Sequence, residues 1–232
     1  MKKTLFVSVG MLSFRLGFCT APAARAAEPV RFDHVVRNDF FAGFSGNAEA
    51  LKRGMEKTAQ VLSAEPNNAE ALVWHGAGLF YQSGQAFQSG DNQKGMEMWG
   101  KGLGMMDQAV ALAPDAIGVR IPRGAAMMQT SHFGPPAQQK ELLSRAVSDY
   151  QRAYDLQKDG IATMATHPKG ELLIGLADGL ERTGEAEKSK EFLRQLVNEM
   201  PDTPYGRNAE KWLAGEKVGP RQRGCLGCHT GN

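Results

Sequence analysis

The amino-acid sequence predicts an all-α protein. In several segments, apolar side chains recur at spacings of three and four residues, which is the pattern of one buried helix face. Pro66, Pro114 and Pro201 each follow such a segment, and proline cannot continue a helix. No segment shows the alternation of apolar and polar residues that predicts a half-buried strand. These observations indicate helices that are joined in pairs by short turns.

Three predicted helix pairs come first along the chain. Residues 35–68 form a pair that turns at Gly46, and residues 69–115 form a pair whose second helix is long. Residues 116–160 form a third pair, with its turn in the stretch "HFGPP" at 132–136. Glycine and proline are typical of such turns because they interrupt a helix.

The last predicted pair, residues 170–203, shows the clearest pattern. Its first helix has apolar side chains on one face, at Leu173, Leu176, Ala177 and Leu180. Gly184 turns the chain, and the second helix has an apolar face of its own, at Leu193, Leu196 and Val197. A half-repeat at residues 204–213 would cap the array.

The stretch "LSAEPNNAEALVWHGAGLF", residues 62–80, resembles the junction between tetratricopeptide repeats. In that family, each repeat is a helix pair of about 34 residues with small residues where the helices cross. By this resemblance, Ala69 begins a repeat and Gly76 lies at the crossing point. The resemblance implies a short right-handed α-solenoid over residues 27–214, with a groove that binds a protein partner.

Residues 1–26 have the pattern of a signal peptide. Two lysines precede the mostly apolar residues 5–16, and small residues at positions 24 and 26 suit a signal peptidase. The apolar stretch is too short to span a bilayer. We therefore expect a soluble periplasmic or otherwise exported protein with no transmembrane segment. A lipid on Cys19 is the alternative, which the bulky Phe18 before it disfavours.

Removal of the signal peptide changes the charge and the cysteine count. It takes four of the 27 basic residues and leaves 23 against 25 acidic residues, a net charge of −2. Since no basic patch is present, no nucleic acid is expected as a partner. Only Cys225 and Cys228 remain, so the mature chain has no structural cysteines unrelated to this pair.

The stretch "GCLGCHTGN", residues 224–232, resembles the haem-attachment motif of c-type cytochromes. Cys225 and Cys228 would add to the two vinyl groups of haem, and His229 would be the proximal iron ligand. The motif predicts one covalent haem c per chain, on a flexible tail at residues 215–232. A reversible thiol–disulfide pair and a zinc site are the alternatives.

Because only three residues follow His229, we expect the apolar haem ring to dock on the repeat body or on a partner. A body histidine would then be the second axial ligand. His132 ranks first because its turn lies at the edge of the array where the tail begins, and His167 ranks second. His75, beside Gly76, is expected to be a core residue.

Other candidates receive ordinary structural roles. His34 lies at the far end of the array, and the methionines and tryptophans of helical segments are expected to fill the core. Arg120 and Arg123 lie near a predicted turn. They could pair with haem propionates, but solvated or helix-end positions are favoured.

The sequence thus predicts an exported monohaem c-type cytochrome whose repeat scaffold docks a redox or scaffold protein. The alternative is a periplasmic adaptor or assembly protein in which haem is structural or sensory. An enzyme is the weakest hypothesis, because no nucleophile–base pair or carboxylate pair is recognisable.

Overall fold

The computed structural model describes residues 31–133 and 136–219. These ranges contain helices and turns but no strand, which confirms the all-α prediction. The signal peptide predicted at residues 1–26 lies outside the described residues, and so do Cys225, Cys228 and His229.

The described residues form nine α-helices and one 3₁₀-helix. In chain order these are α1 (Phe32–Phe44), α2 (Ala48–Ala64), α3 (Ala69–Gln88), α4 (Asn92–Leu112), α5 (Ile117–Thr130), α6 (Pro136–Gln157), η1 (Lys158–Thr163), α7 (Thr166–Arg182), α8 (Ala186–Glu199) and α9 (Pro204–Leu213).

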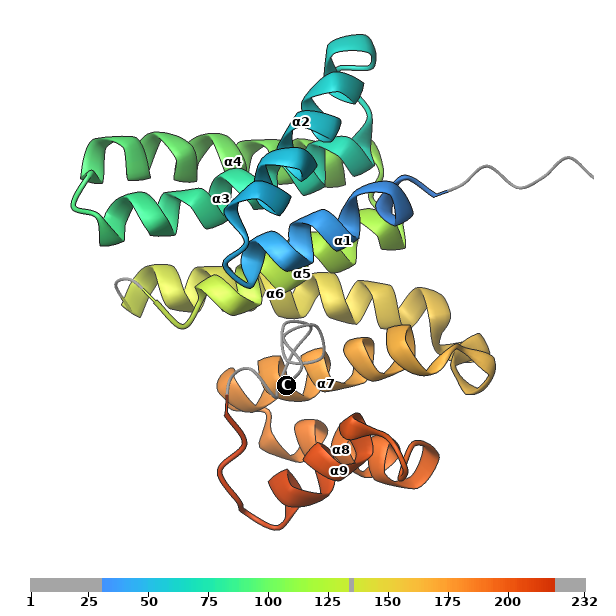
Figure 1. Cartoon of the computed structure of the whole chain (residues 1–232). Helices are drawn as coiled ribbons and strands as arrows, with labels where there is room; N and C mark the ends of the chain where they lie inside the picture. Colours follow the sequence, from blue (N-terminus) through green and yellow to red (C-terminus); the bar gives the residue numbers. More distant parts are fainter. Residues whose placement is uncertain (1–30, 134–135, 220–232) are drawn as a thin grey trace, which may run out of the picture.

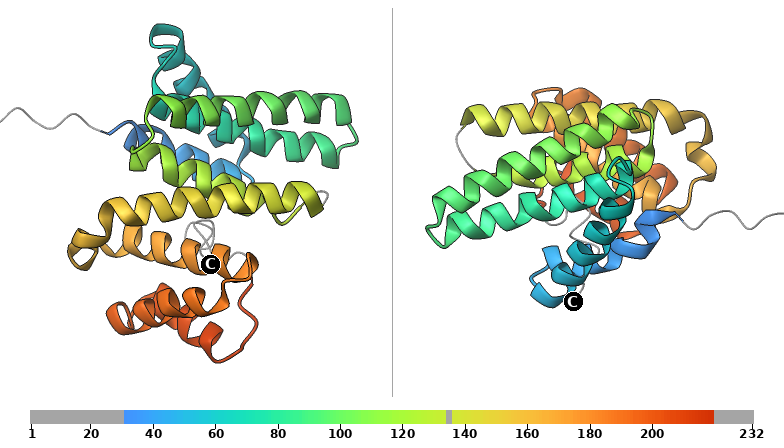
Figure 2. Two further views of the ribbon diagram at one scale, coloured as in Figure 1. Left: turned by 180° about the vertical axis from the view of Figure 1, so that it is seen from behind. Right: turned by 90° about the horizontal axis from the view of Figure 1, so that it is seen from above.

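The helices pack in consecutive pairs, α1 with α2, α3 with α4, α5 with α6 and α7 with α8, and α9 packs on α8. The first helices of successive pairs also contact one another, from α1 to α3, α5 and α7. Figure 1 shows the pairs stacked in chain order, and Figure 2 shows the far ends of α3 and α4 projecting beyond the stack. The predicted solenoid-like arrangement of helix pairs is therefore confirmed.

Two helix boundaries differ from the prediction. Both helices of the second pair are long, at 20 residues for α3 and 21 for α4, whereas only the second was expected to be. The chain turns between them at Gly90, whose φ is 84°. In the last pair, α7 begins at Thr166 rather than at residue 170, separated from the end of η1 by two residues.

Helix α7 is buried on all sides between its first turn and its last residues. The sequence predicted one apolar face, but every residue from Lys169 to Leu180 is buried. Helices α5 and α6 of the preceding pair contact α7 on one side, and its own partner α8, together with α9, contacts it on the other. A Cβ atom at Gly170 would clash with the ring of Tyr205, and one at Gly175 would clash with Tyr150. Glycines therefore let α7 lie at the centre of this half of the stack.

Helices α3 and α4 meet through two glycines. A Cβ atom on Gly76 would lie 2.7 Å from the carbonyl oxygen of Gly102, and one on Gly102 would lie 2.7 Å from that of Gly76. The small-residue crossing that the sequence predicted at Gly76 is present. Along the same contact, the rings of Phe80 and Trp99 have centroids 4.3 Å apart.

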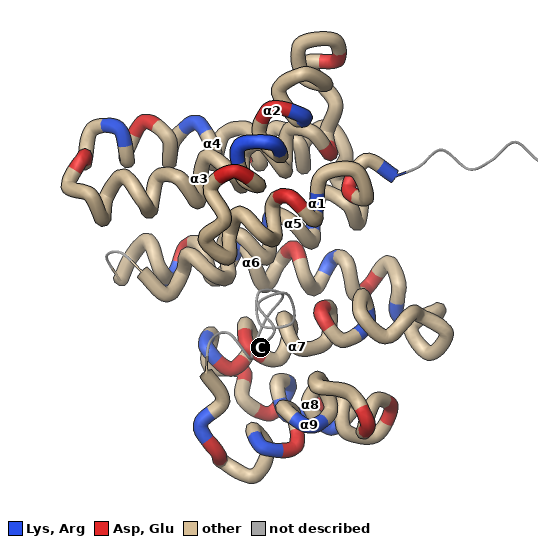
Figure 3. The backbone as a smooth tube through the Cα atoms, in the orientation of Figure 1, with Lys and Arg blue, Asp and Glu red and all other residues tan. Residues whose placement is uncertain are grey.

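Charged residues of both signs are spread over the stack, while α3 carries only Glu70 (Figure 3). Such a nearly uncharged helix is typical of one that packs against several neighbours. No described helix has the length and apolar character that crossing a membrane requires.

Candidate haem-ligand site

The segment that leads to the Cys-x-x-Cys-His motif begins against the repeat body. Trp212 Nε1, at the end of α9, donates to Glu181 Oε1 at 3.0 Å, near the end of α7. The chain then turns at Gly215, whose φ is 80°, and Val218 is buried in the hydrophobic core at 6 % exposure. The predicted tail therefore packs on the body at Val218, whereas residues 215–217 are exposed.

His132 lies in the turn between α5 and α6, as predicted, and it is held by Arg182 at the end of α7. Arg182 Nη1 lies 3.2 Å from His132 Nε2. A guanidinium group has only donors, so Nε2 is the acceptor. Arg182 Nη2 also donates to the carbonyl oxygen of Ser131 at 3.1 Å and to its hydroxyl at 2.6 Å. The Nε2 lone pair that iron would need is therefore directed at a fixed cation.

His167 lies in the first turn of α7 and not in a loop. Its Nδ1 is 2.9 Å from the hydroxyl of Tyr205, which donates its single hydrogen to Glu171 Oε1 at 2.6 Å. His167 Nδ1 is therefore the donor of its pair. Glu171 is buried, and its Oε2 has no hydrogen-bond partner among the described residues. This chain of hydrogen bonds ties α9 to the beginning of α7.

The two histidines predicted as candidates do not come together. His167 is at the beginning of α7, and the Arg182 that contacts His132 is its last residue. The rise of 1.5 Å per residue separates these two positions by about 22 Å. Only His132 lies at the end of α7 where the tail begins.

His75 is half-buried on α3 and makes a hydrogen bond to α2. Its Nδ1 lies 2.8 Å from Thr58 Oγ1. The Thr58 hydroxyl lies 3.1 Å from the carbonyl oxygen of Gly54 and 2.9 Å from that of Met55, so its hydrogen goes to the backbone. Nδ1–H is then the donor to Thr58, and the lone pair of the neutral ring is on Nε2.

The Nε2 atom of His75 has no hydrogen-bond partner in the described part of the chain, and it is not a buried unsatisfied atom. It therefore keeps some exposed surface. Burial lowers the pKa of His75 below its ordinary value of 6.5, and the charge of Lys101 lowers it further. A hydrogen bond to the Met55 backbone raises the pKa but does not offset these two effects. At neutral pH the ring is neutral, which is the form that binds a metal.

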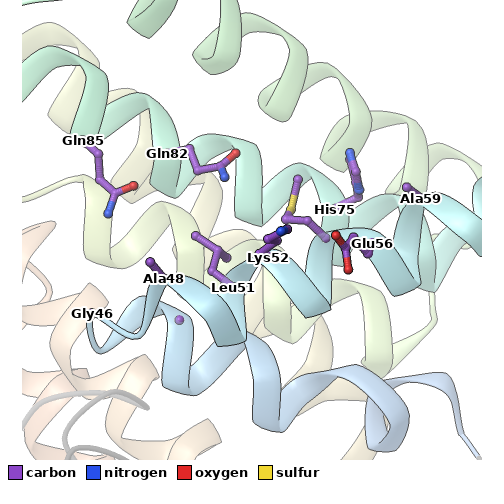
Figure 4. A pocket seen from close by; sticks show the side chains of 11 residues that line it. Gly46, Ala48, Leu51, Lys52, Glu56, Ala59, His75, Gln82 and Gln85 are labelled. Atoms are coloured by element: carbon purple, nitrogen blue, oxygen red, sulfur yellow. The ribbon is translucent and has the colours of Figure 1, made fainter.

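A pocket of about 380 Å³ lies beside His75, between α2 and α3. Figure 4 shows that His75 and Ala59 lie at one end of it, and Gly46 and Ala48 at the other. Its lining combines apolar side chains with a few polar ones, which is the usual character of a site for a small molecule or cofactor. Sequence reasoning missed this site, because nothing in the sequence brings Thr58 and His75 together.

Arg120 and Arg123 lie in α5, which continues through Pro122; Arg120 is in its first turn and Arg123 is inside the helix. Arg123 Nε and Nη2 donate to the two carboxylate oxygens of Asp149 at 2.7 Å each, and Arg120 Nη1 donates to the same residue at 2.7 Å. Burial alone would lower the pKa of Arg123, but Asp149 and Asp107 raise it above its ordinary value. Arg120 has the helix-end position that the sequence favoured, since its Nε donates to the carbonyl oxygen of Pro114 at 2.7 Å, whereas Arg123 is a buried residue inside the helix. Both arginines also join α5 to α6.

The remaining candidates have the roles of core and surface residues. Met106, Met127 and Met128 are buried as predicted, whereas Met96 is 58 % exposed and does not fill the core. His34 Nε2 lies 3.9 Å from Asp33 Oδ1 in the first turn of α1. Over residues 31–133 and 136–219, no three His, Cys, Asp or Glu side chains are grouped as they would be around a metal ion.

Comparison of the sequence with protein-family models found no match, and neither did comparison with curated proteins or with solved structures. The functional argument therefore depends on the residues of this chain alone.

Proposed function

We propose that this protein is an exported monohaem c-type cytochrome, with haem attached to Cys225 and Cys228 and His229 as its proximal ligand. The complete Cys-x-x-Cys-His pattern carries the proposal, since the chain after the predicted signal peptide has no other cysteine. Bound haem would supply reversible one-electron chemistry.

The repeat body supports the proposal through residues that fit a haem. His75 presents an accessible Nε2 on a ring fixed by Thr58, next to a partly apolar pocket. An imidazole whose second nitrogen donates to the protein is the usual form of a histidine ligand. A stack of helix pairs is also a rigid support for docking a redox partner.

The direct test is a pyridine haemochrome spectrum of protein expressed in a periplasm together with a haem-attachment system. We expect one haem per chain that remains after extraction with acidified acetone. The variant Cys225→Ala/Cys228→Ala is the control and should lose it. If the wild-type chain carries no covalent haem, the cytochrome proposal is wrong.

The second candidate function is an adaptor or assembly protein in which haem is structural or sensory. The stacked helix pairs favour it, because such stacks expose an extended surface for other proteins. A potentiometric titration separates the two. Rapid, reversible reduction supports electron transfer, whereas carbon monoxide binding by the resting ferrous protein supports a sensory role.

A further inference from the structure

We propose that His75 is the second axial ligand of the haem, and that the α2–α3 pocket receives the haem-bearing segment that follows Gly219 in the same chain. This inference rests on the proposed haem attachment. It replaces His132 and His167, which the sequence favoured, with a residue that the sequence assigned to the core.

The first argument is the state of the imidazole. The Nδ1–H of His75 is held by Thr58, which is itself fixed to the backbone of α2. This leaves Nε2, accessible and without a partner in the described chain, as the only nitrogen that can bind iron. The Nε2 of His132 instead accepts from Arg182, so iron binding there would first have to displace a cation that Ser131 also holds.

The second argument is the chemistry of the pocket. Leu51, Met55 and Ala59 give its α2 side apolar surface, which suits the face of a porphyrin ring. Lys52 and Glu56 also line the pocket, and no N–O distance of 4.0 Å or less joins Lys52 to a carboxylate of the described residues. The ammonium group of Lys52 is therefore available to a haem propionate. His167, by contrast, is exposed at the beginning of α7.

The third argument is reach. The described chain ends at Gly219, after Trp212 has docked beside the end of α7. Six residues separate Gly219 from Cys225, and they span at most about 21 Å. Helix α7 contacts α5, and α5 contacts α3. At 8–10 Å for each packed neighbour, α3 lies about 16–20 Å from α7. His75 lies toward the beginning of α3, whereas the tail starts at the level of the end of α7, so the distance along the helices adds to this spacing. The segment therefore brings a haem to the α3 layer only when it is nearly fully extended.

The test compares axial ligation in haem-loaded variants. In wild type we expect a six-coordinate, low-spin absorption and electron paramagnetic resonance spectrum. His75→Ala and His75→Gln should convert it to high-spin, and added imidazole should restore the low-spin form of His75→Ala by entering the vacated site. His132→Ala and His167→Ala are the matched controls and should keep the wild-type spectrum. Far-ultraviolet circular dichroism confirms which variants keep the helical fold.

The outcomes distinguish this inference from the proposed function. If haem is attached but both His75 variants remain low-spin, the inference is overturned and the cytochrome proposal stands. The inference is also overturned if wild type shows the charge-transfer band of methionine ligation, which would indicate Met55 as the ligand. It is overturned as well if the low-spin fraction rises with protein concentration, which would indicate that a second copy of the chain occupies the pocket. If no haem is attached, the proposed function itself fails.

Discussion

Three polar contacts hold helices of the stack together in different ways: the α5–α6 contact around Asp149, the contact of Arg182 in α7 with the turn after α5, and the α2–α3 contact around His75. Around Asp149, three arginine N–H groups satisfy a carboxylate with no exposed surface. Around Arg182, the guanidinium is shared among Ser131, His132 and Asp178. At His75, one ring nitrogen is bonded and the other is not. The first two contacts stabilise the stack, and only the third has an atom available for a ligand.

These contacts show that the position of a histidine in the chain does not decide whether it can bind iron. His132 lies in a turn near the tail, where a ligand is easy to imagine, but Arg182 uses its lone pair. His75 lies within a helix, where a core role is easy to imagine, but its Nε2 is accessible. The hydrogen-bond partner of each ring decides which one can serve.

The largest effect is expected when Asp149 is replaced. Asp149→Ala leaves Arg123 buried without its carboxylate and should lower the free energy of unfolding by about 3–5 kcal/mol. Asp115→Ala, which removes an exposed pair with Arg152, should change it by about 0–1 kcal/mol. Urea denaturation followed by circular dichroism measures both. Equal losses would show that the buried network does not hold α5 to α6.

The second effect concerns the close packing of α3 and α4 beside His75. Gly76→Ala puts a Cβ atom 2.7 Å from the Gly102 carbonyl oxygen and should destabilise the fold by about 1–3 kcal/mol. Gly100 lies on α4, the helix that carries Gly102, and a new Cβ atom there would have no other atom within 4 Å. Gly100→Ala should therefore stabilise the fold by up to about 1 kcal/mol. Thermal denaturation should therefore shift in opposite directions. If both variants shifted the denaturation temperature in the same direction, the α3–α4 crossing at Gly76 would be less closely packed than the structure has it.

The third effect is at Arg182. Arg182→Ala removes the donors to Ser131 and should cost about 1–3 kcal/mol, because the carbonyl and hydroxyl lose partners in a part-buried site. Arg194→Ala, on the exposed side of α8, should stay within about 0.5 kcal/mol of wild type. Denaturation midpoints compare the two. If they agree, Arg182 does not fix the α5–α6 turn on α7.

The sequence predicted the helix pairs because their signals are local. Proline and glycine at the turns, and apolar residues at helical spacing, depend on neighbours within a few positions. The Gly76 crossing was predictable in the same way. The pairs Arg123–Asp149, Ser131–Arg182 and Thr58–His75 were not predictable, because their members lie 17 to 51 residues apart along the chain. Such contacts depend on helix packing, so the sequence suggested a ligand histidine but could not identify which one.

The smallest effect expected without haem is a pH dependence at His75. Its pKa is lower in the folded state than the ordinary 6.5, so the unfolded chain takes up a proton first as the pH falls. Stability should therefore be unaffected well above pH 6.5 and should decline below it. Asp39, whose pKa is also lowered, loses its contribution only below its ordinary 3.8.

Urea denaturation of Cys225→Ala/Cys228→Ala at about pH 7.5 and about pH 5.5 measures this decline without haem. Adding His75→Gln should make the decline smaller, and an unchanged decline would show that His75 is not responsible. In the haem-loaded protein, a proton and iron would compete for the same Nε2. Iron binding should therefore move the decline to lower pH, where conversion to high-spin haem should accompany it. Asp149→Ala should not alter this conversion as long as the variant remains folded.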